Sequence, residues 1–154
     1  MARTVNEVLA ATARDVLEEA AFVFATPARR EIEWPASVVE VELDFAGPVT
    51  GRLWLRCTPD LGALVAANLM GIEPSEPEAA AQAETAAGEL LNIVAGALLA
   101  RIHGTREVFH LGLPRVRHVP SGGPAPAPAV GLVADDLHPL ELAIAPAAPA
   151  EAAR

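Results

Sequence analysis

A carboxylate and an amide stand three residues apart in the stretch 85–104, at Glu89 and Asn92. On a helix, this spacing places both side chains on one face, where they can accept and donate hydrogen bonds. The same face carries only polar or very small residues, namely Thr85, Glu89, Asn92, Gly96 and His103. Such a stripe is either a solvated helix surface or a functional site for binding or catalysis. Asn is the less expected residue on a plain surface, because it costs on the order of a few tenths of a kcal/mol inside a helix.

The element that must present this stripe is a long amphipathic helix. Its apolar residues recur at helical spacing and share one broad face, which we expect to lie in the core. These residues are Leu90, Leu91, Val94, Leu98 and Ile102. The pattern Ser75-Glu-Pro-Glu78 predicts a capping box that starts the helix, and Gly104 predicts its end.

Length and composition indicate one domain. The chain has 154 residues, of which 52% are apolar and 4% aromatic, which is enough to bury a core without a disulfide or a cofactor. We expect the domain to span residues 1–145 and the Ala-Pro segment 146–154 to be a disordered tail. No apolar run approaches the roughly 18 residues of a membrane span, and the N-terminus does not resemble a signal peptide. These features predict a cytoplasmic protein without a membrane partner.

The charge and the rarer residue types exclude several function classes. A net charge of −9 argues against nucleic acid as the main partner, because phosphate binding needs clustered cations. The chain has no Lys, so Schiff-base chemistry and a P-loop are absent. Its single Cys57 cannot form an intramolecular disulfide and is predicted to be a buried apolar residue. The four histidines are not at metal-ligand spacing.

The first segment, about residues 5 to 25, has the spacing of an amphipathic helix that ends before Pro27. We expect the apolar tail Ala-Ala-Phe22-Val-Phe24 to anchor the end of this helix in the core.

Residues 38–57 then alternate between apolar and polar side chains around Ala46-Gly47-Pro48, which predicts a β-hairpin. The expected register places Val41 opposite Leu53 and Glu42 opposite Arg52. In this register Trp54 points away from the core, so a terminal segment or another subunit should cover it.

The remaining segments complete a mixed fold. Residues 58–71 predict a short helix that begins after the cap Thr58 and ends at Gly71, and residues 108–119 predict an extended stretch bent by Pro114. The Pro/Ala/Gly-rich segment 120–129 reads as a mobile loop, and residues 130–144 as a final hairpin. We therefore predict an α+β fold, with an antiparallel sheet, helices packed on one face, and two similar helix-hairpin halves.

The segment Thr85-Ala-Ala-Gly-Glu-Leu-Leu-Asn-Ile-Val-Ala-Gly resembles the signature helix of the CheX-type and CheC-like chemotaxis phosphatases. In that family Asp or Ser is followed by Glu-x-x-Asn and often by Gly. The hairpin from Val41 to Leu55, the segment Leu69-Met-Gly-Ile-Glu and the segment Leu111-Gly-Leu-Pro114 are similar to further parts of the family. The resemblance extends over about residues 5 to 145.

The resemblance implies a phosphatase for the aspartyl-phosphate of a CheY-like response regulator. Asn92 would orient the attacking water, and Glu89 would pair with the regulator's active-site Lys. Gly88 and Gly96 would let loops of the partner approach the helix. Any Mg²⁺ would belong to the regulator, so the chain would need no cofactor of its own.

Two features depart from the family pattern. Thr85 stands where Asp or Ser is expected, and the first helix has no Glu-x-x-Asn. The resemblance implies a single site, as in the CheX-type subgroup. It also implies a homodimer joined through the sheet, and here Trp54 or an edge strand could serve that contact. The alternatives are a non-catalytic CheC-like interaction module and a small-molecule sensor, for which the sequence contains no apolar pocket signal.

Overall fold

The computed structural model describes residues 3–121, 123–126 and 128–146. In this part of the chain, seven strands form one antiparallel sheet in the order β1-β6-β7-β3-β2-β4, and β5 also pairs with β2. The strands are β1 (Ala25–Pro27), β2 (Ser37–Ala46), β3 (Gly51–Cys57), β4 (His110–Leu111), β5 (Arg115–Pro120), β6 (Val130–Ala134) and β7 (His138–Pro146).

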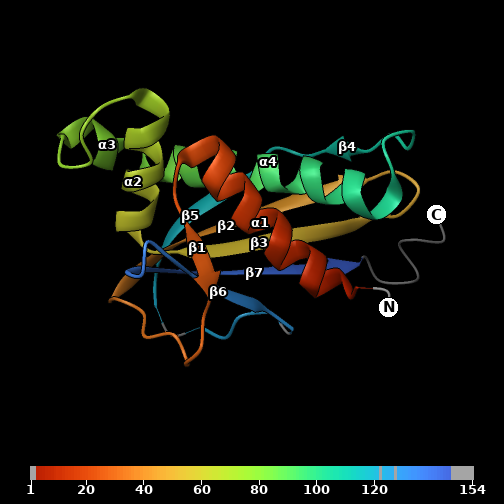
Figure 1. Cartoon of the computed structure of the whole chain (residues 1–154), viewed down its shortest axis with the longest axis horizontal. Coiled ribbons are helices and arrows are strands. Elements are labelled where there is room, and N and C mark those ends of the chain that lie inside the picture. Colours follow the sequence, from red (N-terminus) through yellow and green to blue (C-terminus); the bar gives the residue numbers. More distant parts are fainter. Residues whose placement is uncertain (1–2, 122, 127, 147–154) are drawn as a thin grey trace.

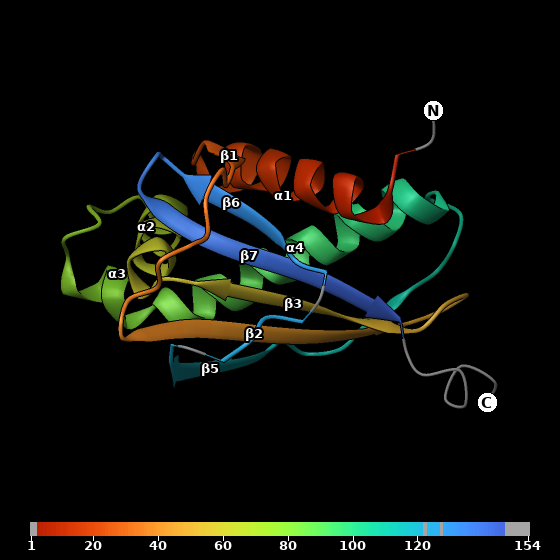
Figure 2. The same ribbon diagram turned by 90° about the horizontal axis from the view of Figure 1, so that it is seen from below.

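Helices α1 and α4 lie across one face of this sheet, and α2 and α3 stand at its end (Figure 1, Figure 2). The helices are α1 (Val5–Ala21), α2 (Pro59–Met70), α3 (Pro77–Ala81) and α4 (Ala83–His103). The core lies between these helices and the apolar side chains on the facing side of the sheet. The predicted α+β class, with an antiparallel sheet and helices on one face, is confirmed.

The sheet contains two hairpins, β2-β3 and β6-β7, which meet where β3 pairs with β7. Each hairpin is flanked by a strand from the other half of the chain, because β1 pairs with β6 and β5 pairs with β2. A helix precedes the strands of each half, α1 in the first and α4 in the second. The order of elements thus agrees with two similar halves that exchange their flanking strands.

Helix α1 ends earlier than its sequence pattern predicts. A capping box between Thr4 and Glu7 starts the helix, and Phe22 ends it in the left-handed backbone conformation, with φ 57°. The prediction that the apolar tail of this helix lies in the core is confirmed for Ala21 and Val23 and is wrong for Phe22 and Phe24, whose side chains are 70% and 63% exposed. Val23 between them is the buried residue, since the chain becomes extended there and neighbouring side chains point in opposite directions.

The other helix boundaries follow local signals in part. The Thr58 hydroxyl accepts a hydrogen bond from the Leu61 amide, and Gly71 ends α2 with φ 70°, as predicted. The predicted capping box at Ser75 is wrong. Helix α3 starts instead after Glu76 without a side-chain cap, and a turn at Gln82 separates it from α4. The prediction that Gly104 ends the long helix is confirmed.

The β2-β3 hairpin has the predicted faces but a different register. Val41 lies opposite Leu55, and Asp44 lies opposite Arg52. The predicted register is therefore wrong by two residues, because the turn after Ala46 contains four residues before β3 begins at Gly51. A shift of two keeps every side chain on its predicted face. Cys57 accordingly lies in the core, as predicted.

The outer face of the sheet, away from the helices, is partly covered by the chain itself. Trp54 is only 6% exposed. The Arg56 guanidinium carbon lies 5.0 Å from the ring centroid of Trp54 and 5.6 Å from that of Trp34, in the connection between β1 and β2. Trp54 is therefore covered within this chain, with Arg56 against its ring, and offers little surface for the predicted dimer contact. The homodimer itself stays a prediction.

The segment after α4 forms β4 and β5, with Pro114 between the two strands, which agrees with the predicted bend. Within the predicted loop 120–129, the Gly123 carbonyl accepts a hydrogen bond of 2.9 Å from Arg56 Nη2. Residues 122 and 127 of this loop lie outside the described residues. The predicted tail 146–154 does too, apart from Pro146 at the end of β7.

Candidate functional site

Helix α4 is surrounded by protein on most sides, since it packs against α1, α2, β2, β3 and β5. Alanines, leucines and a valine fill those contacts, which suits a helix closely packed on several sides. Arg101 also ties the helix to α1 through an ion pair of 2.9 Å with Asp15. Along its open side, Thr85, Glu89 and Gly96 are exposed and Asn92 is partly exposed. We call these four residues the polar stripe.

Glu89 and Asn92 point away from the core, at positions one helical turn apart. No hydrogen bond or ion pair joins either side chain to another residue within the described chain. A buried Asn92 would have ruled out the predicted site, but Asn92 is partly exposed. A carboxylate and an amide in this position are available to another molecule.

The two glycines that were predicted to admit a partner differ in their surroundings. At Gly96, an added Cβ atom would meet no atom within 4 Å, so this part of the stripe is open. Gly88 is buried, and a Cβ atom there would lie 3.1 Å from Val116 Cγ2 and 3.4 Å from Pro114 Cβ. The predicted reason for Gly88 is therefore wrong. Its missing side chain leaves room for this chain's own β5 and not for a partner.

A polar contact that the sequence pattern did not reveal holds the start of α4 against the sheet edge. Glu84 Oε1 lies 3.4 Å from His118 Nδ1 on β5, and His118 Nε2 lies 2.9 Å from the Ser37 hydroxyl oxygen on β2. The three residues come from distant parts of the sequence, so no local spacing could indicate them. Their position next to Thr85 fixes the end of the polar stripe.

A shallow hollow of about 300 Å³ opens beside Gly96. It is lined by Gly96, Leu99, Ala100, Gly104, Thr105, Glu107, Phe109 and Leu111. The polar stripe therefore continues into a concave surface between the last turns of α4 and the segment that leads into β4. A projecting loop of a partner would find space there without displacing a side chain of α4.

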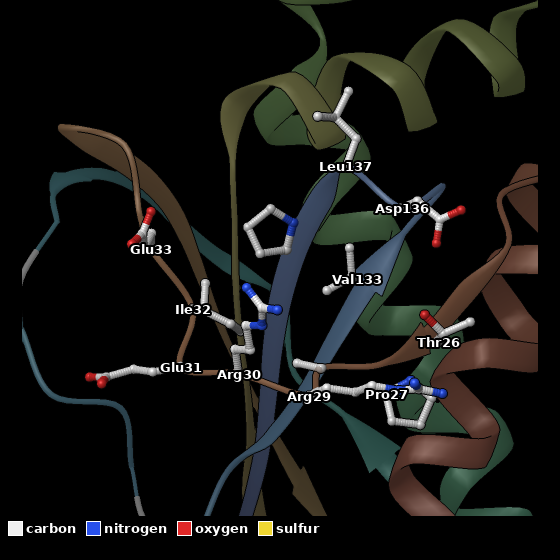
Figure 3. A pocket seen from close by; sticks show the side chains of 12 residues that line it. Thr26, Pro27, Arg29, Arg30, Glu31, Ile32, Glu33, Val133, Asp136 and Leu137 are labelled. Carbon is white, nitrogen blue, oxygen red and sulfur yellow. The ribbon is translucent and has the colours of Figure 1, made fainter.

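Two larger hollows lie away from the polar stripe. One, of about 760 Å³, is lined by residues 26–33 and by the β6-β7 hairpin, and carries both arginines and carboxylates (Figure 3). The other, of about 470 Å³, is mostly apolar and lies between the start of α1, the end of α4 and the β2-β3 turn. The sequence had shown no sign of this apolar hollow. His103 lines it and packs 5.1 Å from the Phe109 ring, so His103 departs from the polar stripe.

Among the described residues, no group of three or more His, Cys, Asp or Glu side chains could hold a metal ion. Helix α4 is the one described helix that is long and apolar enough to cross a membrane by length and composition, with 21 residues and a mean hydropathy of 1.4. Glu89, Asn92 and Arg101 interrupt its apolar residues, so this finding does not contradict the expectation that no apolar run approaches about 18 residues. Half of the residues in the most apolar 18-residue stretch of α4 are buried within the molecule.

Solved structures with the same fold are chemotaxis and related proteins. CheX from Vibrio vulnificus has a TM-score of 0.68 at 15% identity, covering 94% of this chain and 100% of that chain. The CheX-CheY-BeF3-Mg complex from Borrelia burgdorferi gives 0.65 at 20% identity, covering 94% and 99%. FliY from Thermotoga maritima gives 0.61 at 16% identity, covering 96% and 93%. At these identities the similarity shows the fold alone.

The sequence itself carries the stronger match. No curated protein sequence matches the chain. The family model described as "Chemotaxis phosphatase CheX" matches residues 39–122, more than half of the chain, from the first hairpin through α4 to the end of β5. This range includes every residue of the polar stripe. The chain therefore belongs to the CheX family of chemotaxis phosphatases.

Proposed function

We propose that this chain dephosphorylates the aspartyl-phosphate of a CheY-like response regulator. The observation that carries the proposal is the pair of side chains Glu89 and Asn92, one turn apart on the open side of α4 and without a hydrogen bond or ion pair to other described residues. Family membership and the CheX-CheY complex from Borrelia burgdorferi, which has the same fold, support this choice of partner.

In the proposed reaction, Asn92 enters the regulator's active site and orients a water molecule for in-line attack on phosphorus. The water oxygen forms the new P–O bond while the bond to the aspartyl oxygen breaks, so the regulator regains its carboxylate and phosphate leaves. A neutral amide suits this task because positioning and electrostatic stabilisation supply most of the catalysis of phosphoryl transfer. Mg²⁺ is held by the regulator, and this chain contributes no metal ligand.

Glu89 has a separate role in docking. A carboxylate on an exposed helix face can form a charge-assisted hydrogen bond with the ammonium group of the regulator's active-site Lys. Thr85, at the start of the stripe, offers a hydroxyl to the same partner, and Gly96 with its neighbouring hollow admits a loop. Docking by Glu89 places Asn92, one turn further along the helix, next to the phosphoryl group.

The alternative is a non-catalytic interaction module for a motility signalling complex. Thr85 is the observation behind it, because Thr keeps a hydroxyl but lacks the negative charge of the Asp that the family pattern has as one of its two residues here. In that case the same helix face would bind the regulator without accelerating the loss of phosphate.

The decisive experiment follows phosphate loss from ³²P-labelled CheY-like receiver domains with and without this protein. We expect the wild-type protein to accelerate phosphate loss. The acceleration should fall by about 100-fold or more in Asn92→Ala, by analogy with the removal of a water-positioning or oxyanion-stabilising group. Asn92→Ala should still bind the receiver, whereas Glu89→Ala should bind it more weakly. Binding by the wild type without faster phosphate loss would leave the interaction module as the function.

A further inference from the structure

The edge of the sheet beside α4 contains an extra residue. β4 and β5 both pair with β2, with Leu111 opposite Phe45 and Arg115 opposite Glu42. Between these two pairs the chain advances by three residues along β2, from Glu42 to Phe45, but by four residues along the edge segment, from Leu111 to Arg115. The additional residue makes a β-bulge within the connection Gly112–Pro114, and such bulges redirect a side chain at the edge of a sheet.

This bulge is held firmly. The Gly112 amide donates a hydrogen bond of 2.7 Å to the Asp44 carbonyl oxygen on β2. Pro114 has a restricted φ angle and packs beside Gly88 of α4, as does Val116. The connection runs along α4 in Figure 1. A residue at the centre of the bulge is therefore presented from a defined backbone and not from a free loop.

The central residue is Leu113, and its side chain is 87% exposed, more than any other large hydrophobic side chain in the described residues. Its neighbour Pro114 contacts the position of Gly88, which immediately precedes Glu89 in α4. On the other side, Leu111 lines the hollow beside Gly96. The exposed aliphatic group of Leu113 is thus carried by a segment whose residues on either side lie against Gly88 of α4 and line the hollow beside Gly96. Protein interfaces commonly combine such apolar contacts with polar groups.

We propose that Leu113 is an apolar anchor for the docked response regulator, so that the docking surface extends from α4 over the bulge at Gly112–Pro114. This inference rests on the proposed function and adds a residue that determines affinity without taking part in the reaction. The receiver domain that fits this surface has an apolar patch beside its active-site Lys. Glu89 would pair with the Lys, while Leu113 would be buried against the patch.

The test compares Leu113→Ala with Leu137→Ala. Leu137 is a matched control, since it is a 71% exposed leucine in the β6-β7 turn and lines the hollow of Figure 3, away from the polar stripe. The probe is a CheY-like receiver domain activated by beryllofluoride and Mg²⁺. We expect Leu113→Ala to raise the Kd of the receiver about tenfold, a typical effect of truncating an interface anchor. Leu137→Ala should leave the Kd unchanged.

Kinetics separate anchoring from chemistry. With phosphorylated receiver, Leu113→Ala should raise KM about tenfold and leave kcat within twofold of the wild type, because the lost contact is the same in ground and transition states. Leu113→Met should restore most of the affinity by restoring the apolar bulk. A Kd for Leu113→Ala within twofold of the wild-type value would overturn the inference.

The two proposals can fail independently. If the wild type binds the activated receiver without releasing phosphate, the proposed hydrolysis fails, and the Kd of Leu113→Ala still decides the anchor. If phosphate is released and Asn92→Ala abolishes that release, but Leu113→Ala binds like the wild type, only the anchor fails. A wild-type protein that binds none of the activated receivers overturns the anchor as well.

Discussion

At the scale of single residues, the contacts of a side chain decide whether it is available for function. Glu89 and Asn92 have no partner in the described chain, although Glu84 on the same helix is held by His118. The difference lies in position, because Glu84 faces the edge strand β5 and the polar stripe faces outward. The backbone of a packed helix is already ordered, so binding of a partner costs rotamer entropy of the free side chains but little backbone entropy, which suits a docking site.

The two glycines of α4 lead to a pair of opposed stability predictions. Gly96→Ala should raise the free energy of unfolding by about 0.5–1 kcal/mol, because Ala favours a helix and nothing lies within 4 Å of the new Cβ. Gly88→Ala should gain less or lose stability, because its Cβ would press on Val116 and Pro114. Urea denaturation measures both. A larger gain for Gly88→Ala than for Gly96→Ala would contradict this account of the helix-strand contact.

Cys57 provides a chemical test of the core. Burial raises the pKa of its thiol to about 12, so the reactive thiolate is scarce near neutral pH. We expect native protein at pH 8 to react with Ellman's reagent far more slowly than protein unfolded in guanidinium chloride. Absorbance at 412 nm follows the reaction. Equal rates for the native and unfolded protein would place Cys57 at the surface.

At the scale of elements, the edge of the sheet near β5 both carries charged side chains and supports the helix that presents the polar stripe. The edge of the sheet near β5 carries a ladder of charges on its outer face, formed by Glu42, Asp44, Arg52 and Arg115. The opposite side of β5 contacts α4 through Val116 and His118. Strand β5 thereby links the charged outer face to the helix that carries the polar stripe.

The ladder should make stability depend on pH in the acid range. Hydrogen bonds from Arg52 and then Arg115 hold the pKa of Asp44 below its ordinary value of 3.8. Because the pKa is lower in the folded state, the stabilisation is present above about pH 4 and is lost as the pH falls through the folded-state pKa. The difference in unfolding free energy between wild type and Asp44→Asn should therefore be constant from pH 5 to 7 and shrink below pH 4. Urea denaturation across this range measures it, and a difference that grows on acidification would contradict the assignment.

At the scale of the whole molecule, the two faces of the sheet are closed in different ways. Apolar side chains of α1 and α4 close the inner face, whereas a buried ion pair and two tryptophans close part of the outer face. The Arg56 guanidinium donates to Glu40 Oε2 through Nε at 2.9 Å and through Nη2 at 2.7 Å. Arg56 also holds the loop at Gly123 in place.

Removing Arg56 should therefore cost more than removing an exposed arginine. Arg56→Ala leaves the buried Glu40 without its main partner, and we expect a loss of about 3 kcal/mol in the free energy of unfolding. Arg52→Ala, which breaks exposed pairs on the same face, should cost less than about 1 kcal/mol. Tryptophan emission during urea denaturation reports both. Similar losses for the two variants would contradict the buried role of Arg56.

The sequence by itself determined the features that depend on near neighbours. Helical spacing placed Glu89, Asn92 and Gly96 on one outward stripe, alternation assigned the faces of the first hairpin, and the caps at Thr58, Gly71 and Gly104 followed from local backbone chemistry. These signals work because a helix or strand repeats its geometry over a few residues. The resemblance to the chemotaxis phosphatases added the choice of reaction, and the family match supports it.

Only the tertiary structure decided which distant residues meet. It set the hairpin register, buried Trp54 beside Arg56, and gave the space at Gly88 to β5. It also placed the bulge that contains Leu113 against α4, where Pro114 packs beside Gly88. These contacts join segments that are far apart along the chain, and their geometry depends on how all the elements pack together. No local spacing records that geometry, so the full extent of the docking surface became visible only in the fold.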